Sequence, residues 1–131
     1  MLARLLTLAW QAGDQEAAGW VGELLEEREQ ARKCLTFRPG SADGRWCVIE
    51  GGRQIVFTSR SRGTRELYRL AHGEHIAYTT RAEGEALRGR LQTALQELRD
   101  NKAHLLAEVL ERGITVGRRG PATYQGEPVT T

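Results

Sequence analysis

The first third of the chain has the hydrophobic spacing of α-helices. Apolar residues recur three and four positions apart between residues 2 and 10, and again between residues 17 and 25, which is the period of a helix with one buried face. Gly13 and Asp14 separate the two stretches, a pair that is typical of a helix end followed by a new N-cap. We therefore expect two helices before residue 34.

The pattern changes at residue 44, where apolar and polar residues begin to alternate as they do in a half-buried β-strand. The glycines at positions 51 and 52 favour a two-residue hairpin turn. This turn fixes the register of the two strands that it joins, because a slip of one residue would reverse every side chain. The register predicts three facing pairs: Glu50 with Arg53, Val48 with Ile55, and Trp46 with Phe57.

Two further loops, at residues 61–64 and 72–74, would extend the hairpin into a four-stranded antiparallel meander. Tyr68 and Tyr78 then continue the row that Trp46 and Phe57 begin. We interpret this aromatic row as core, not as a platform for stacked bases, because the neighbouring row is aliphatic. Cys34–Arg38 is a candidate fifth strand.

A single long helix is predicted from Glu83 to Glu111, with a leucine stripe along one face, and Gly113 ends it. A helix of this length would run about 43 Å at 1.5 Å per residue, so one end would project beyond the sheet. The remaining residues are rich in Gly, Pro and Thr and predict a flexible C-terminal tail. The expected fold class is α+β, with a single domain over residues 1–112 and a tail over 113–131. Its elements would be two N-terminal helices, a four- to five-stranded antiparallel β-meander, and a long C-terminal helix packed on the sheet.

Composition places the chain among ordinary soluble proteins, with 131 residues and a formal net charge of +2. No stretch approaches the length of a membrane span. Cys34 and Cys47 fit free thiols in a reducing cytoplasm better than a disulfide framework. We expect a small cytoplasmic accessory protein of bacterial, phage or plasmid origin, without a membrane partner.

The positive charge is concentrated in the middle of the chain, where residues 34–81 hold eight basic residues and four acidic ones. In the predicted register these arginines lie on the outer sheet face and at one loop tip, where they would contact a nucleic acid, a nucleoprotein complex or an acidic protein surface. The alternative is a solvated sheet face. The candidate binding residues are Arg45, Arg53, Arg60, Arg62, Arg65 and Arg69.

Other chemistry finds little support in the sequence. A zinc site built from Cys34, Cys47, His72 and His75 lacks a close ligand pair, and Cys47 and His75 would lie about 14 Å apart across three strand spacings. The histidines form the one acid–base cluster, and it falls in a tight turn. A helix-turn-helix at Gly13 would bring five acidic side chains against phosphate. We therefore expect no metal, no cofactor and no enzymatic activity.

Residues Leu91–Leu110, LQTALQELRDNKAHLLAEVL, resemble the closing helices of TubC-type N-terminal docking domains. These small dimeric modules join subunits of peptide and polyketide synthases. The family's run Leu-Arg-x-x-Lys-Ala-x-Leu-Leu is matched here by Leu98, Arg99, Lys102, Ala103, Leu105 and Leu106. The resemblance covers about twenty residues, and the hairpin and size of the family do not match the rest of the chain.

What the resemblance implies is a helical surface for docking or homodimerisation. A near-heptad stripe on the same helix points independently to such a surface, and the alternative is that this stripe covers the sheet. The candidate interface residues are Leu91, Leu98, Leu105 and Val109.

Overall fold

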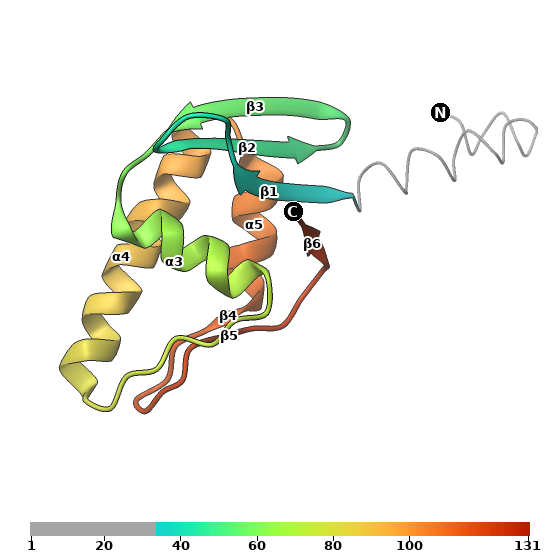
Figure 1. Ribbon diagram of the computed structural model, residues 1–131. Coiled ribbons are helices and arrows are strands. Elements are labelled where there is room, and N and C mark those ends of the chain that lie inside the picture. The colour runs from blue at the N-terminus through green and yellow to red at the C-terminus, as the bar shows by residue number, and fades with distance from the viewer. Residues whose placement is uncertain (1–33) are drawn as a thin grey trace, which may run out of the picture.

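The computed structural model describes residues 34–131, and the two helices expected before residue 34 lie outside the described residues. The described part is an α+β fold with three helices, a mixed four-stranded sheet and a two-stranded ribbon. The helices lie on one side of the sheet, and the ribbon lies at the end of the molecule farthest from it (Figure 1).

The sheet has the order β3-β2-β1-β6. Its strands are β1 (Leu35–Pro39), β2 (Arg45–Glu50), β3 (Arg53–Thr58) and β6 (Val129–Thr130). The first three form antiparallel pairs, whereas β6 pairs with β1 in parallel.

The predicted hairpin register is confirmed at all three facing pairs. Gly51 and Gly52 both have positive φ, +54° and +80°, as the tight turn requires. The candidate fifth strand is also confirmed, because β1 lies beside β2 with Phe37 opposite Val48.

The third and fourth strands of the predicted meander are absent, and this prediction was wrong. A helix, α3 (Arg62–Ala71), replaces the third strand, and an extended segment with a single bridge from Ile76 to Ala122 replaces the fourth. The side chain of Ser61 caps the helix by accepting from the amide of Thr64, at 3.2 Å. Gly73, with a φ of +86°, closes its end by donating to the carbonyl of Leu70.

The predicted long helix is also wrong, because the chain breaks it into α4 (Arg81–Asp100) and α5 (His104–Gly113). Lys102 adopts a left-handed φ of +69° and donates its amide to Arg99, while Ala103 donates to Leu98. These two bonds form a Schellman motif, in which the residue with left-handed φ is usually glycine. With 20 residues, α4 spans about 30 Å, so the projecting helix of about 43 Å does not exist.

Residues 113–131, expected to form a flexible tail, instead complete the fold. The strand β4 (Ile114–Thr115) pairs with β5 (Thr123–Tyr124), and β6 returns to the main sheet. Ala122 and Val129 are buried, with 0% and 8% exposure. The composition of Gly, Pro and Thr therefore reflects tight turns here.

The core lies between the inner face of the sheet and the helices. The prediction that the aromatic residues form core is confirmed for Trp46, Phe57 and Tyr78, which are all buried. Tyr68 is half-buried and reaches this cluster from α3, with its ring 5.4 Å from that of Trp46 and 5.7 Å from that of Phe37. The same aromatic cluster thus forms through a helix where a strand had been expected.

A buried carboxylate joins the hairpin to the helices. One oxygen of Glu50 accepts from Arg53 at 3.0 Å, and the other accepts from the amide of Leu106 at 2.8 Å. Because α5 has no side-chain cap of its own, Glu50 supplies the missing acceptor at its first turn. Arg53 also donates to the carbonyl of Lys102 at 2.7 Å, which holds the break between α4 and α5 against the hairpin.

Candidate nucleic-acid interface

The exposed face of α3 consists entirely of arginine. Arg62, Arg65 and Arg69 are exposed, Tyr68 is half-buried, and every other residue of the helix is buried. The three arginines stand at positions i, i+3 and i+7, so they form one row along the helix. We call this row the arginine stripe.

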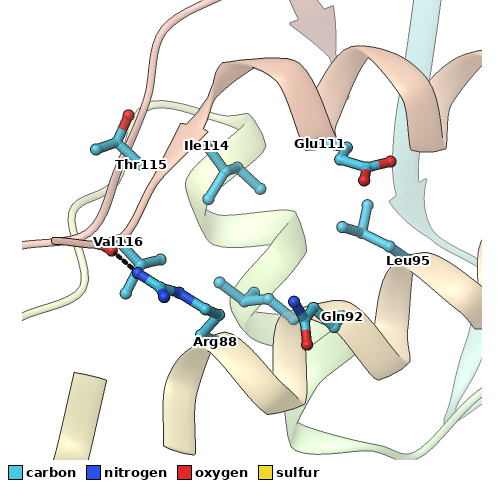
Figure 2. Close-up of a pocket in the computed structure, with 8 residues that line it drawn as sticks. Arg88, Gln92, Leu95, Glu111, Ile114, Thr115 and Val116 are labelled. Atoms are coloured by element: carbon cyan, nitrogen blue, oxygen red, sulfur yellow. Dashed lines mark hydrogen bonds between the residues drawn. The ribbon is translucent and has the colours of Figure 1, made fainter. Parts of the chain in front are cut away.

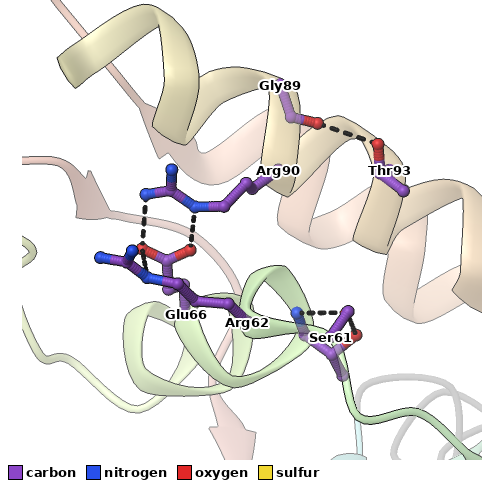
Figure 3. A network of polar contacts seen from close by, with 7 residues as sticks. Ser61, Arg62, Glu66, Gly89, Arg90 and Thr93 are labelled. Atoms are coloured by element: carbon purple, nitrogen blue, oxygen red, sulfur yellow. Dashed lines mark hydrogen bonds and ion pairs between the residues drawn. The ribbon is translucent and has the colours of Figure 1, made fainter.

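Nearby acidic groups neutralise part of the stripe and leave Arg65 without an ion pair to a described residue. The side chain of Glu66 is buried and accepts two hydrogen bonds from Arg90 of α4, at 2.7 and 3.0 Å (Figure 3). This hydrogen bonding is the main reason why the pKa of Arg90 is raised above its ordinary value. Arg62 reaches the same carboxylate only at 3.8 Å, and Arg69 pairs with exposed Glu74 at 2.8 Å.

A hollow at the start of α3 extends the basic surface. Arg45, Arg60 and Arg65 line a cavity of about 510 Å³ between the β1–β2 loop and the helix, together with a single acidic residue, Asp43. None of the three arginines makes an ion pair with a described residue. The side chain of Arg60 lies against Gly44, where a Cβ atom would come within 2.8 Å of it. Glycine at this position therefore lets Arg60 lie along the loop.

A second hollow lies along the stripe itself. Arg62, Arg65 and Arg69 line a cavity of about 560 Å³ together with one acidic residue, Glu66, and with Ile76 and Ala77 from the extended segment. Arg65 borders both hollows, so the two adjoin at this residue. We define the arginine surface as Arg45, Arg60, Arg62, Arg65 and Arg69.

Five of the six arginines selected from the sequence are thus brought together, and the sixth is not. Arg53 lies at the Gly51–Gly52 turn, where it bonds to Glu50 and to the carbonyl of Lys102. It lines neither hollow of the arginine surface. Its contacts are those of a residue that joins the hairpin to the helices.

The candidate interface residues of the C-terminal helices lie mostly inside the fold. Leu91 and Leu98 are buried, with 3% and 0% exposure, and belong to the core. Leu105 and Val109 of α5 are half-buried and pack against that core. Any partner surface on this stripe would therefore rely on Leu105 and Val109.

Another hollow of about 370 Å³ lies between α4 and β4 (Figure 2). Leu91, Leu95 and Ile114 give it apolar walls, and Arg88 crosses its rim to donate to the carbonyl of Val116. Both of the charged groups that line it bond within the protein, since Glu111 pairs with Arg99.

The residues considered for metal or acid–base chemistry are dispersed. Cys34 is exposed and Cys47 is buried, and both are free thiols. The Nε2 atom of His72 bonds to the carbonyl of Phe37 at 2.8 Å, whereas His75 is exposed. No group of three metal-binding side chains occurs within residues 34–131.

Sequence reasoning missed one basic feature. Arg118 and Arg119 are exposed in the turn that joins β4 to β5. The expectation of a flexible tail over residues 113–131 gave these two arginines no fixed position. The sequence Gly-Arg-Arg-Gly was the available signal, since glycines on both sides of a polar pair are typical of a turn.

Comparisons with known proteins identify no relative of this chain. No family model matches the chain, and neither a curated protein nor a solved structure is similar to it. Within residues 34–131, no helix combines the length and the apolar character needed to cross a membrane.

Proposed function

We propose that this protein is a non-catalytic binding protein that contacts the phosphates of a nucleic acid through its arginine surface. The observation that carries the proposal is the exposed face of α3, which offers no side chain other than arginine. Arginine is suited to this role because its planar fork of donors matches phosphate oxygens.

Solvation alone is a weaker explanation of this surface. Arg65 and Arg69 are four residues apart on one helix, and such like-charge pairs destabilise a helix by about 0.2–0.5 kcal/mol, which the exposed pair of Arg69 with Glu74 offsets in part. Arg45 and Arg60 add further positive charge beside Arg65, in the hollow at the start of α3. A bound polyanion would relieve the repulsion that the isolated protein maintains.

An acidic protein surface is a less suitable partner than nucleic acid. Protein interfaces commonly centre on large apolar or aromatic side chains in addition to arginine. In the described part of the chain, Val56 is the one large hydrophobic residue that is strongly exposed, and it borders neither hollow of the arginine surface. Phosphate contacts require charge and hydrogen-bond donors, which this surface has.

Docking or homodimerisation through the C-terminal helix was the alternative function. It rested on a near-heptad stripe, on a local resemblance and on a helix of about 43 Å with a projecting end. The break at residues 101–103 removes the projecting end, and Leu91 and Leu98 of the stripe are buried in the core. The nucleic-acid proposal therefore has the stronger physical basis.

The test is a comparison of two triple variants of the full chain in a fluorescence-anisotropy titration with labelled nucleic acid. One variant carries Arg62→Gln, Arg65→Gln and Arg69→Gln. The control carries Arg81→Gln, Lys102→Gln and Arg112→Gln, which remove the same charge from exposed positions outside the arginine surface. Glutamine has a helix propensity close to that of arginine, so α3 should remain folded, as circular dichroism would check.

We expect the stripe variant to bind more weakly than both the control and the wild type. The slope of log affinity against log salt should fall by about 2.7, or about 0.9 for each phosphate that the variant no longer neutralises. Equal weakening of the two variants, or a wild-type affinity that does not change with salt, would contradict the proposal.

A further inference from the structure

The turn between β4 and β5 presents two arginines that the arginine surface does not include. Gly117 and Gly120 flank Arg118 and Arg119, and both arginine side chains are exposed. Neither arginine makes an ion pair with a residue of the described region. The turn thus offers two positive charges on a narrow tip.

Tyr78 holds this tip from both sides. Its hydroxyl donates to the carbonyl of Gly117 at 2.5 Å, and its own carbonyl accepts from the amide of Gly120 at 3.3 Å. A Cβ atom on Gly120 would lie 2.6 Å from that carbonyl, so the close approach requires glycine. Arg88 donates to the carbonyl of Val116 on the adjoining arm. The two arginines are therefore held on a braced turn, which limits the entropy cost of binding.

The tip and the arginine stripe border the same extended segment. Ile76 and Ala77 line the hollow beside the stripe. On its other side, Ile76 exchanges two backbone hydrogen bonds with Ala122, at 3.1 and 2.8 Å. Figure 1 shows this segment running from α3 alongside the β4–β5 ribbon. The two basic features therefore lie on either side of one extended segment, which Glu83 at the start of α4 also borders.

The aromatic residues near this surface argue against single-stranded nucleic acid. Proteins that bind single strands stack bases on exposed aromatic rings. Here Trp46, Phe57 and Tyr78 are buried, and the ring of Tyr68 packs between Trp46 and His72. Within residues 34–131 no exposed aromatic ring offers a stacking platform beside this surface, so the contacts that this part of the chain provides are to the phosphates. One helix-packing distance of about 8–10 Å plus one strand spacing of about 4.8 Å places the two basic features about 13–15 Å apart. This separation suits the two backbones that border a groove about 12 Å wide.

We propose, on the basis of the function proposed above, that the ligand is a nucleic-acid duplex. The arginine stripe contacts one phosphate backbone, and Arg118 and Arg119 contact the other across the groove. Binding depends on the shape and charge of the duplex and not on its sequence, because the contacts are to phosphates.

The experiment uses a short DNA duplex and one of its single strands, each titrated with the full chain over about 50 to 200 mM salt. The test variant is Arg118→Gln with Arg119→Gln. Its matched control, Lys102→Gln with Arg112→Gln, removes the same charge from two exposed positions, one in the break before α5 and one in its last turn. A third variant, Arg118→Lys with Arg119→Lys, keeps the charge at the tip.

We expect the wild type to bind the duplex more tightly than the single strand. The tip variant should weaken duplex binding and lower the salt slope by about 1.8, the value for two phosphate contacts, for duplexes of any sequence. The control and the lysine variant should retain the wild-type slope.

The failure of this inference can be told apart from the failure of the proposed function. If the tip variant bound the duplex with an unchanged salt slope, the proposed contact of Arg118 and Arg119 would be wrong. If the wild type preferred the single strand, the assignment of a duplex ligand would be wrong. In both cases a loss of binding in the stripe variant would still support the proposed function. If the wild type bound neither nucleic acid, both proposals would be wrong.

Discussion

At the scale of single residues, Glu50 has the largest structural role of any charged side chain in the hairpin. Its buried carboxylate accepts from Leu106 at the first turn of α5 and from Arg53 across the turn. A buried amide without an acceptor retains the full cost of its desolvation. The stability of α5 therefore depends on a residue more than fifty positions earlier in the sequence.

Replacement of Glu50 by Ala should lower the free energy of unfolding by about 1–3 kcal/mol, because the amide of Leu106 would stay buried without a partner. Urea unfolding followed by circular dichroism measures this. The control is Glu85→Ala, which removes an exposed carboxylate paired with Arg81 and should cost less than about 0.5 kcal/mol. Similar destabilisation of the two variants would show that Glu50 does not cap α5.

Lys102 is the second residue whose backbone decides the local structure. Its φ of +69° is sterically costly for any residue with a Cβ atom. Lys102→Gly should raise the free energy of unfolding by about 0.5–1 kcal/mol, since glycine reaches this conformation without strain. The matched control is Asn101→Gly at the preceding position, where φ is −93° and glycine should destabilise. A fall in stability for Lys102→Gly would be inconsistent with a strained left-handed lysine.

At the scale of elements, α3 and α4 pack unusually closely. A Cβ atom on Gly63 would lie 2.3 Å from the carbonyl oxygen of Arg90, so glycine allows the two backbones to touch. The guanidinium of Arg90 then forms its two bonds with buried Glu66 one turn along α3. This pair fixes the orientation of α3, and therefore the direction in which the arginine stripe faces.

Arg90→Gln should destabilise the fold by about 2–3 kcal/mol, less than a fully buried pair because Arg90 is partly exposed. The reason is that the carboxylate of Glu66 would remain buried without its main partner. Chemical denaturation compares this variant with Arg81→Gln, whose partner is exposed and whose removal should cost under about 0.5 kcal/mol. If Arg90→Gln proved no more costly than that control, the pair would not fix the packing of α3.

The sequence predicted the elements that local chemistry determines. The glycine pair at positions 51 and 52 fixed the β2–β3 register correctly, because a two-residue turn leaves one alignment. The helix α3 was missed because Tyr68 and Leu70 fit a period of two, while Leu67, Leu70 and Ala71 fit the helical period equally well. Ser61 and Gly73, the cap and stop signals, would have decided between them.

The break between α4 and α5 and the arrangement of the arginines were not predicted from the sequence pattern. The break between α4 and α5 uses a lysine where glycine is usual, and the signal beside it, Asn101, marks a helix end less strongly than glycine does. The arginines of the candidate site were selected on a strand model that placed Arg65 and Arg69 on an outer sheet face. The structure brings them together for a different reason, because helical spacing aligns Arg62, Arg65 and Arg69 in one row.

At the scale of the whole molecule, the C-terminal strand closes the described fold. Val129 of β6 lies opposite Leu35 of β1, 94 positions away in the sequence, and both side chains are buried. Thr130 donates to the carbonyl of Leu35 and bonds to the hydroxyl of Thr36, both at 3.2 Å. Figure 1 shows the last strand returning beside β1 after the ribbon at the opposite end of the molecule. Parallel pairing over such a separation leaves no local pattern, which explains why the sequence suggested a flexible tail.

Deletion of residues 128–131 should therefore lower the free energy of unfolding by about 2 kcal/mol. The deletion removes the burial of one valine side chain, which contributes about 1.5–3 kcal/mol, and two hydrogen bonds, one of them exposed. The conformational entropy that the released segment no longer loses on folding offsets part of this loss. Urea unfolding measures it, and Pro128→Ala in the full chain, a change at an exposed position, is the control that should remain near the wild type. A flexible tail would give the opposite result, with the same urea midpoint for the truncated and full-length proteins, and β6 would then contribute nothing to the sheet.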